Sequence, residues 1–269
     1  MTRELEKNLP RPIKEVIAEF PALLTILNDY DIGCGSCLVG TCLLQDIVSV
    51  HGLPPEQERE LMARIAGLLA AGGQAESPAA APPPRPKEAR TYSPPLKKLV
   101  DEHVLIKEWL ALIPEVIVRL DLSSPEGKKI VSDGLDFIRS YADRFHHGKE
   151  EEILFKYFAA GTEIIQAMQS DHETGRGHVR AIREALERGD GQTICTHLQA
   201  YRELLLEHIK KEDEILFPWM DRNLSVADKD RLTSQFATAA EEMESELGSD
   251  LPARYTKLIA DLEQKITVS

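Results

Sequence analysis

Two short segments of this chain repeat a histidine and a glutamate at a spacing suited to binding metal. HHGKEEEILF at residues 146–155 matches HIKKEDEILF at residues 208–217 at seven of ten positions. In each copy the histidine precedes a glutamate by four residues, about 400° around an α-helix, so imidazole and carboxylate share one face. His146 thus pairs with Glu150, and His208 pairs with Glu212.

Both His–Glu pairs are expected to point into a hydrophobic core. Ile153 and Leu154 follow His146 at helical spacing, and an equivalent apolar pair follows His208, so the polar face coincides with the apolar one. A single His–Glu pair usually lies on the surface. Two copies in one core need compensation, because an unpartnered buried carboxylate costs several kcal/mol. A metal centre supplies that compensation.

Two further histidines complete the candidate centre. His103 and His172 each stand among apolar residues of another long helical segment, which places one ligand-bearing position on every helix. Four imidazoles and two carboxylates suit two metal ions with the carboxylates bridging them, and iron is the favoured metal. The six candidate ligands are therefore His103, His146, Glu150, His172, His208 and Glu212.

Other polar residues near these ligands are given lesser roles. His147 is rotated by about 100° from His146 on an α-helix, so we expect it to hydrogen-bond behind the ligands or to be exposed. Tyr201, seven residues before His208, could donate a hydrogen bond behind the ligands, but packing is the simpler expectation.

The remaining histidines are excluded from the centre. A second ligand on the third helix should stand four residues after His172, but the chain has Arg176 there. His178 lies about 240° around the helix from His172 and is excluded on that ground. His51 and His197 have no matching carboxylate and are interpreted as ordinary polar residues.

Four long helical stretches must position the six ligands. Apolar residues recur at three- and four-residue spacing, which favours an all-α four-helix bundle, over residues 95–120, 125–159, 163–188 and 191–223. Short turns between them predict antiparallel neighbours in an up-down-up-down order. Two extra C-terminal helices, at residues 225–247 and 252–266, are expected to pack outside the bundle.

A stretch rich in proline and alanine divides the chain. Residues 72–94 lack an apolar period and are interpreted as an extended linker. Residues 1–71 before it are expected to form a small helical domain containing cysteines, with helical patterns near residues 13–29, 43–51 and 55–69. Residues 95–269 after it are expected to form the bundle.

The amino-acid composition argues against some classes of binding partner. A formal net charge of −13 argues against nucleic acid and against an anionic membrane surface, because phosphate contacts need clustered Lys and Arg. The first residues contain no apolar signal segment, and the chain nowhere has 18 uninterrupted apolar residues. We therefore expect a soluble cytoplasmic protein.

Three of the four cysteines stand close together, as Cys34, Cys37 and Cys42. In a reducing compartment this pattern favours metal or redox chemistry. They could hold an iron–sulfur cluster, which usually needs a fourth ligand, or Cys34 and Cys37 could cycle between dithiol and disulfide. They could also be buried, unreactive cysteines. Cys195 is interpreted as a plain helix residue.

The two HxxxE segments resemble the hemerythrin-like HHE cation-binding family, over about residues 92–269. Within it the pattern is most similar to di-iron proteins linked to repair of iron–sulfur centres, whose four His and two bridging Glu match the six candidates. The N-terminal unit resembles small helical domains of unknown function found beside hybrid-cluster and hemerythrin-like proteins. The repair proteins carry adjacent cysteines, whereas this chain has Cys34-x-x-Cys37.

This resemblance implies a di-iron protein that binds or reduces O2, NO or peroxide in oxidative or nitrosative stress, or in iron–sulfur repair. Whether it is an enzyme stays open, with a di-iron oxidoreductase as the class considered. The alternative is a redox or gas sensor whose cysteine-containing domain binds a partner protein or an iron–sulfur cluster. Iron storage or donation is a passive third option. A redox partner protein and a homodimer through the N-terminal domain are further expectations.

Overall fold

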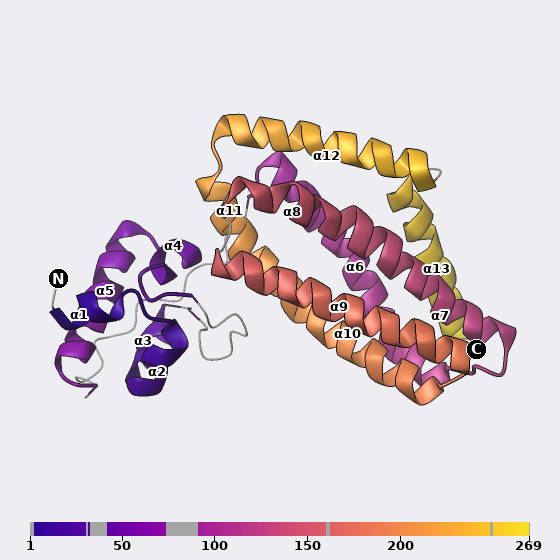
Figure 1. The fold of residues 1–269 in the computed structure, drawn as a ribbon, viewed down its shortest axis with the longest axis horizontal. Coiled ribbons are helices and arrows are strands. Elements are labelled where there is room, and N and C mark those ends of the chain that lie inside the picture. Colours follow the sequence, from indigo (N-terminus) through magenta and orange to yellow (C-terminus); the bar gives the residue numbers. More distant parts are fainter. Residues whose placement is uncertain are drawn as a thin grey trace. The chain divides into compact units, whose positions relative to one another are not determined.

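The computed structural model describes residues 3–30, 32, 42–73, 91–159, 162–247 and 250–268. The chain divides into two compact units, Met1–Arg90 with Pro218–Met220, and Thr91–Phe217 with Asp221–Ser269. Regular structure in the described ranges is helical apart from one isolated bridge between Pro12 and Leu43. The all-α prediction is confirmed (Figure 1). Most of the expected linker at residues 72–94 lies outside the described residues.

The N-terminal unit contains short helices around a core of its own. They are α1 (Arg3–Asn8), α2 (Ile13–Glu19), α3 (Ala22–Asp29), α4 (Ile47–His51) and α5 (Pro55–Ala70). The pattern expected as one helix over residues 13–29 is split at Pro21, because proline has no N–H to continue a helical ladder. Leu23, Leu27, Leu61 and Ile65 are fully buried in the core of this unit.

The second unit is a bundle with four long helical arms, as predicted. Its helices are α6 (Pro94–Arg119), α7 (Pro125–Phe137), α9 (Glu163–Arg188) and α10 (Gly191–Lys211). Figure 1 shows α9 and α10 lying side by side. The C-terminal helices α12 (Val226–Leu247) and α13 (Leu251–Val268) pack against α6 from outside, which confirms the two extra helices.

Local sequence signals set the helix ends. Ser124 caps α7 by accepting a hydrogen bond from the Gly127 backbone N–H at 3.0 Å. Gly189 ends α9 in the left-handed conformation at φ 70°, which costs glycine little. Asp190 then caps α10 by accepting from the Thr193 backbone N–H at 3.1 Å. These tight connections place neighbouring helices antiparallel.

Aromatic residues fill the bundle core between α6, α7 and α13. Trp109 of α6 lies over Gly134 of α7 so closely that a Cβ at position 134 would stand 2.3 Å from the indole ring. Phe137 packs against both Trp109 and Tyr255. None of the helices in the described ranges is long and apolar enough to cross a membrane.

Candidate metal centre

The repeated motif does not lie on a regular α-helix. The stretch expected as one helix over residues 125–159 changes after α7 into a π-helix, η1 (Ile138–His147), then α8 (Gly148–Glu152) and a 3-10 turn, η2 (Leu154–Tyr157). The second copy is likewise interrupted by a π segment, η3 (Glu212–Leu216), before α11 (Phe217–Asn223). The continuous helices expected here are therefore wrong, and π segments are often found at functional sites.

All six predicted ligands are buried and lie together, and His147 joins them. Two groups of ligand atoms, each within 4.8 Å of one another, could hold a metal ion. Group 1 consists of His103, His146, Glu150 and Glu212, and group 2 consists of His147, Glu150, His172 and His208.

His147 is the residue whose position sequence reasoning misjudged. Its side chain is buried, and its ring stacks on that of His172 with centroids 3.9 Å apart. A π-helical turn holds more residues than an α-helical turn, so successive side chains diverge less. His146 and His147 can therefore both face inward.

Each motif glutamate lies between the two groups. Glu150 places one oxygen 3.5 Å from Nε2 of His146 and the other 3.5 Å from Nε2 of His172. Glu212 places its oxygens 3.2 Å from Nε2 of His103 and 3.2 Å from Nε2 of His208. Glu150 thus belongs to both groups, and Glu212 of group 1 has its second oxygen against His208 of group 2.

The donor set fits bound cations. Among the described residues, all four oxygens of Glu150 and Glu212 are buried without a hydrogen-bond donor, which is costly unless a cation compensates. The Nε2 atoms of His103 and His146 face each other at 2.9 Å, and those of His172 and His208 at 3.0 Å.

Each of these imidazoles also has a carboxylate on its Nδ1 side. Nδ1 of His103 lies 2.7 Å from Asp213, and Nδ1 of His146 lies 2.9 Å from Glu102. When Nδ1–H donates outward, the Nε2 lone pair of a neutral imidazole is directed inward, as a metal ligand requires.

The same pattern continues on the other two helices. Nδ1 of His172 lies 2.5 Å from Glu151, and Nδ1 of His208 lies 3.3 Å from Asp171. The four contacts join α6 to η1, α8 to α9, α9 to α10 and η3 back to α6. We call this closed circuit of four His–carboxylate pairs the outer ring.

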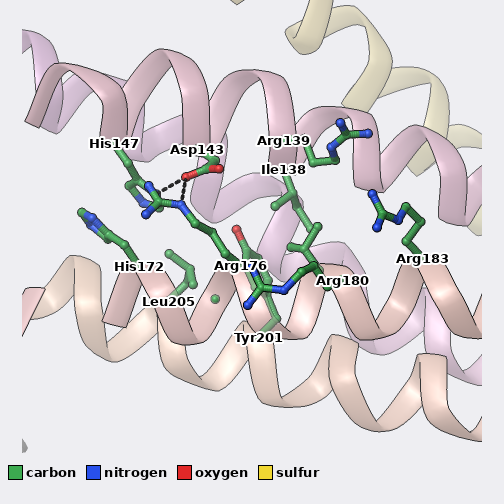
Figure 2. A pocket seen from close by; sticks show the side chains of 12 residues that line it. Ile138, Arg139, Asp143, His147, His172, Arg176, Arg180, Arg183, Tyr201 and Leu205 are labelled. Carbon is green, nitrogen blue, oxygen red and sulfur yellow. Dashed lines mark hydrogen bonds and ion pairs between the residues drawn. The ribbon is translucent and has the colours of Figure 1, made fainter. Parts of the chain in front are cut away.

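A lysine or arginine side chain forms an ion pair with each carboxylate of the outer ring. Lys107 binds Asp213 at 3.0 Å and Lys211 binds Asp171 at 2.6 Å, while Lys149 contacts Glu102. Arg176 binds Glu151 at 2.9 Å and also reaches Asp143, the carboxylate 3.5 Å from Nδ1 of His147. Figure 2 shows Asp143 between His147 and Arg176.

Sequence reasoning missed these outer residues, although part of the signal was visible. Each motif copy has a lysine three residues after its histidine, Lys149 and Lys211, and both lysines are buried. Each copy also has an acid five residues after its histidine, Glu151 and Asp213. A buried lysine beside a motif glutamate signals a carboxylate partner.

Close neighbours shift the pKa values of the candidate ligands, and so their affinities for protons. Burial lowers the pKa of His208, but Glu212 and Asp171 outweigh burial and raise that pKa to about 9. Burial and the neighbouring Glu212 charge raise the pKa of Glu150 well above its usual range. Although burial opposes it, the charge of His208 keeps the pKa of Glu212 low. A bound cation would displace these protons.

The other candidates that the structure describes lie outside the two groups. Cys34 and Cys37 fall outside the described residues. Cys42 has a partly buried side chain against the N-terminal core, and its carbonyl accepts from the Ile13 backbone N–H at 2.8 Å. Cys195 lies in α10 with Sγ 4.0 Å from the Ile117 carbonyl oxygen.

His178 and His197 form a separate pair. Their Nδ1 atoms lie 2.8 Å apart, and both residues are only partly buried. Neither residue belongs to a candidate metal group in the described part of the chain. Tyr201 is buried in the core, as expected, and also lines a pocket beside group 2.

Comparison with known families agrees with this geometry. Residues 94–220 match the model of the hemerythrin HHE cation binding domain, a range that contains both groups. Residues 94–220 are a hemerythrin HHE cation-binding domain. The predicted resemblance to the hemerythrin-like HHE family is thereby confirmed for these residues, and the domain with its buried His and Glu groups fits a metal-binding protein.

The curated relatives add no function to the hemerythrin-like assignment. The chain is 26% identical over 176 residues to uncharacterized proteins from Mycobacterium bovis and from two strains of Mycobacterium tuberculosis. These matches cover 59% of this chain and 67% of each relative. No solved structure matches the chain.

Proposed function

We propose that this hemerythrin-like domain holds two iron ions and binds or reduces O2, NO or peroxide. The observation that carries the proposal is the position of Glu150 and Glu212, each of which has one oxygen within 3.5 Å of an imidazole of group 1 and the other within 3.5 Å of an imidazole of group 2. A single metal site would not need two carboxylates placed between two sets of imidazoles. Imidazole with carboxylate is a donor set that suits iron among the divalent metals.

A bound pair of ferrous ions would supply electrons and open coordination positions to a small ligand. The chain's own residues would hold the ions and keep water out. Group 1 has two imidazoles and group 2 has three, while both share Glu150. His147 and His172 of group 2 line a pocket, whereas the group 1 ligands do not. This asymmetry favours group 2 as the position that an incoming ligand reaches.

Metal analysis of anaerobically purified protein tests the proposal. We expect two irons per chain at the two groups, no acid-labile sulfide from the bundle, and a spectral change when O2 or NO is added. E150Q combined with E212Q is the matched negative variant, because glutamine keeps the side-chain size without the charge. Wild-type protein without iron, or the same iron content in the double variant, would overturn the proposal.

A sensor remains the second candidate, because the chain forms two compact units. In this reading the N-terminal unit binds a partner protein or an iron–sulfur cluster and reports the state of the bundle. Cys42 is held near the start of α2 by the backbone pairing of residues 11–13 with 42–44. Acid-labile sulfide that C42S removes would favour this candidate, and its absence would leave a thiol couple or inert cysteines.

A further inference from the structure

A pocket of about 220 Å³ lies beside group 2, between η1, α9 and α10. Figure 2 shows His147 and His172 at one end of it and Arg139 and Arg183 at the other. Its volume corresponds to roughly seven waters at about 30 Å³ each. A diatomic ligand needs far less room, so the pocket is large enough for a small organic molecule.

Arginines dominate the end of the pocket away from the histidines. Arg176, Arg180 and Arg183 follow one another at four- and three-residue spacing on α9, so they share a helix face. Arg139 of η1 also lines the pocket, from the opposite wall. Arg176 is engaged with Asp143 and Glu151. Across the described part of the chain, the other three arginines form no ion pair.

Arg139, Arg180 and Arg183 are exposed to solvent, and together they make the outer end of the pocket positive in a chain that is acidic as a whole. Asp and Glu number 45 against 32 Lys and Arg, so acidic partners are plentiful elsewhere. The one carboxylate lining the pocket, Asp143, is already bound by Arg176 at 2.9 Å. A guanidinium stays charged throughout the physiological pH range and binds carboxylate or phosphate oxygens in pairs. The positive charge at this end of the pocket therefore favours an anion over a neutral or cationic molecule.

The inner part of the pocket can hold the body of such an anion. Ile138, Val179 and Leu205 supply apolar walls. The Tyr201 side chain is 2% exposed, yet its hydroxyl points into the pocket and has no hydrogen-bond partner among the described residues (Figure 2). Because the pocket leaves this hydroxyl accessible, it can donate a hydrogen bond to a molecule bound there.

We propose that this pocket binds a small organic anion whose carboxylate or phosphate group lies against Arg139, Arg180 and Arg183. Its other end reaches the Tyr201 hydroxyl, next to His147 and His172. The molecule would thus lie beside group 2 without needing to replace a ligand of either group. The inference does not depend on which metal the groups hold.

Calorimetric titration of the purified full-length protein tests this site. Malonate and inorganic phosphate are titrated separately at constant ionic strength, with chloride as the background anion. We expect one of them to bind, and we expect the R139Q/R180Q/R183Q variant to lose at least about tenfold in affinity. R188Q is the matched control, because Arg188 is exposed on α9 and does not line the pocket.

Two single-residue variants allow the binding site to be tested even if the triple variant does not fold. R180Q alone is compared with R188Q should the triple variant not fold, and Y201F tests the hydroxyl without removing the ring. Binding of malonate alone assigns a carboxylate, and binding of phosphate alone assigns a phosphate. No binding of either, or equal affinity in R180Q, Y201F and R188Q, would overturn the inference. Metal content measured on the same samples shows separately whether the proposed di-iron function fails.

Discussion

Nδ1 of His103 lies 2.7 Å from Oδ1 of Asp213, although 110 positions separate the two residues. Asp213 follows Glu212 directly, and its other oxygen binds Lys107 at 3.0 Å. This contact closes the outer ring between the last helical arm of the bundle and the first. Because the carboxylate accepts from Nδ1–H, it fixes the imidazole tautomer that a metal needs at Nε2.

Removing the charge of Asp213 should therefore weaken metal binding without removing a ligand. We expect D213N to lower metal affinity about 10- to 100-fold, measured by competition with a chromogenic chelator. D101N is the matched control, because Asp101 is an exposed acid of α6 that pairs with Lys97 on the surface. Equal affinities of D213N and D101N would show that the outer ring does not support the ligands.

The two motif glutamates should each be needed for a full metal complement. E150Q and E212Q keep the side-chain size but remove the oxygen that each carboxylate offers to one of the groups. We expect either change to lower the metal content from two ions to about one or fewer per chain. Glu152 and Glu214 lie two residues further on and are exposed, so E152Q and E214Q should bind as much metal as the wild-type protein does.

His147 should contribute to one of the two sites only. It belongs to group 2 and not to group 1. We therefore expect H147Q to lower the affinity for one metal ion while the other stays bound. Stepwise titration with a metal-sensitive indicator would show one tight site in place of two. H197Q serves as the comparison, because His197 pairs with His178 outside both groups. Two tight sites in H147Q would contradict a ligand role for His147.

The sequence was sufficient to predict the bundle and six of the buried residues of the site. The duplicated motif carries that information locally, since a four-residue spacing and a following apolar pair define one helix face. His147 could not be placed in this way. Its inward position depends on the π-helix η1 (Ile138–His147), and apolar periodicity does not distinguish an α-helix from a short π segment.

The outer ring was only partly visible in the sequence for a different reason. Glu102 and Asp171 each directly precede a candidate ligand, as in Glu102–His103, yet they serve histidines of neighbouring helices. Lys149 contacts Glu102 across 47 positions. Which carboxylate meets which imidazole depends on helix packing, and no local pattern encodes that.

Removing bound metal should lower the thermal stability of the bundle. A ligand that binds only the native state stabilises it by about 4 kcal/mol at a thousand times its Kd. Chelation would also leave the Glu150 and Glu212 oxygens buried without donors. We expect calorimetry to show a lower Tm after chelation of wild-type protein. The E150Q/E212Q variant should show little change on chelation, and an unchanged wild-type Tm would contradict a stabilising metal.

Close packing between α6 and α7 gives a prediction that is independent of the metal. A Cβ at Gly134 would stand 2.3 Å from the ring of Trp109, which is buried. We expect G134A to lower the free energy of unfolding by about 1–3 kcal/mol in urea titration, because an overpacked core must shift.

G177A is the matched control for this prediction. A Cβ at Gly177 would meet only the far end of Arg180 at 3.8 Å, and alanine favours a helix over glycine by roughly 0.5–1 kcal/mol. Its stability should therefore equal or exceed that of wild type. Similar stabilities of G134A and G177A would contradict the close approach of Trp109. Since G134A removes no ligand, metal content per folded chain should stay at the wild-type level, which separates a loss of packing from a loss of the site.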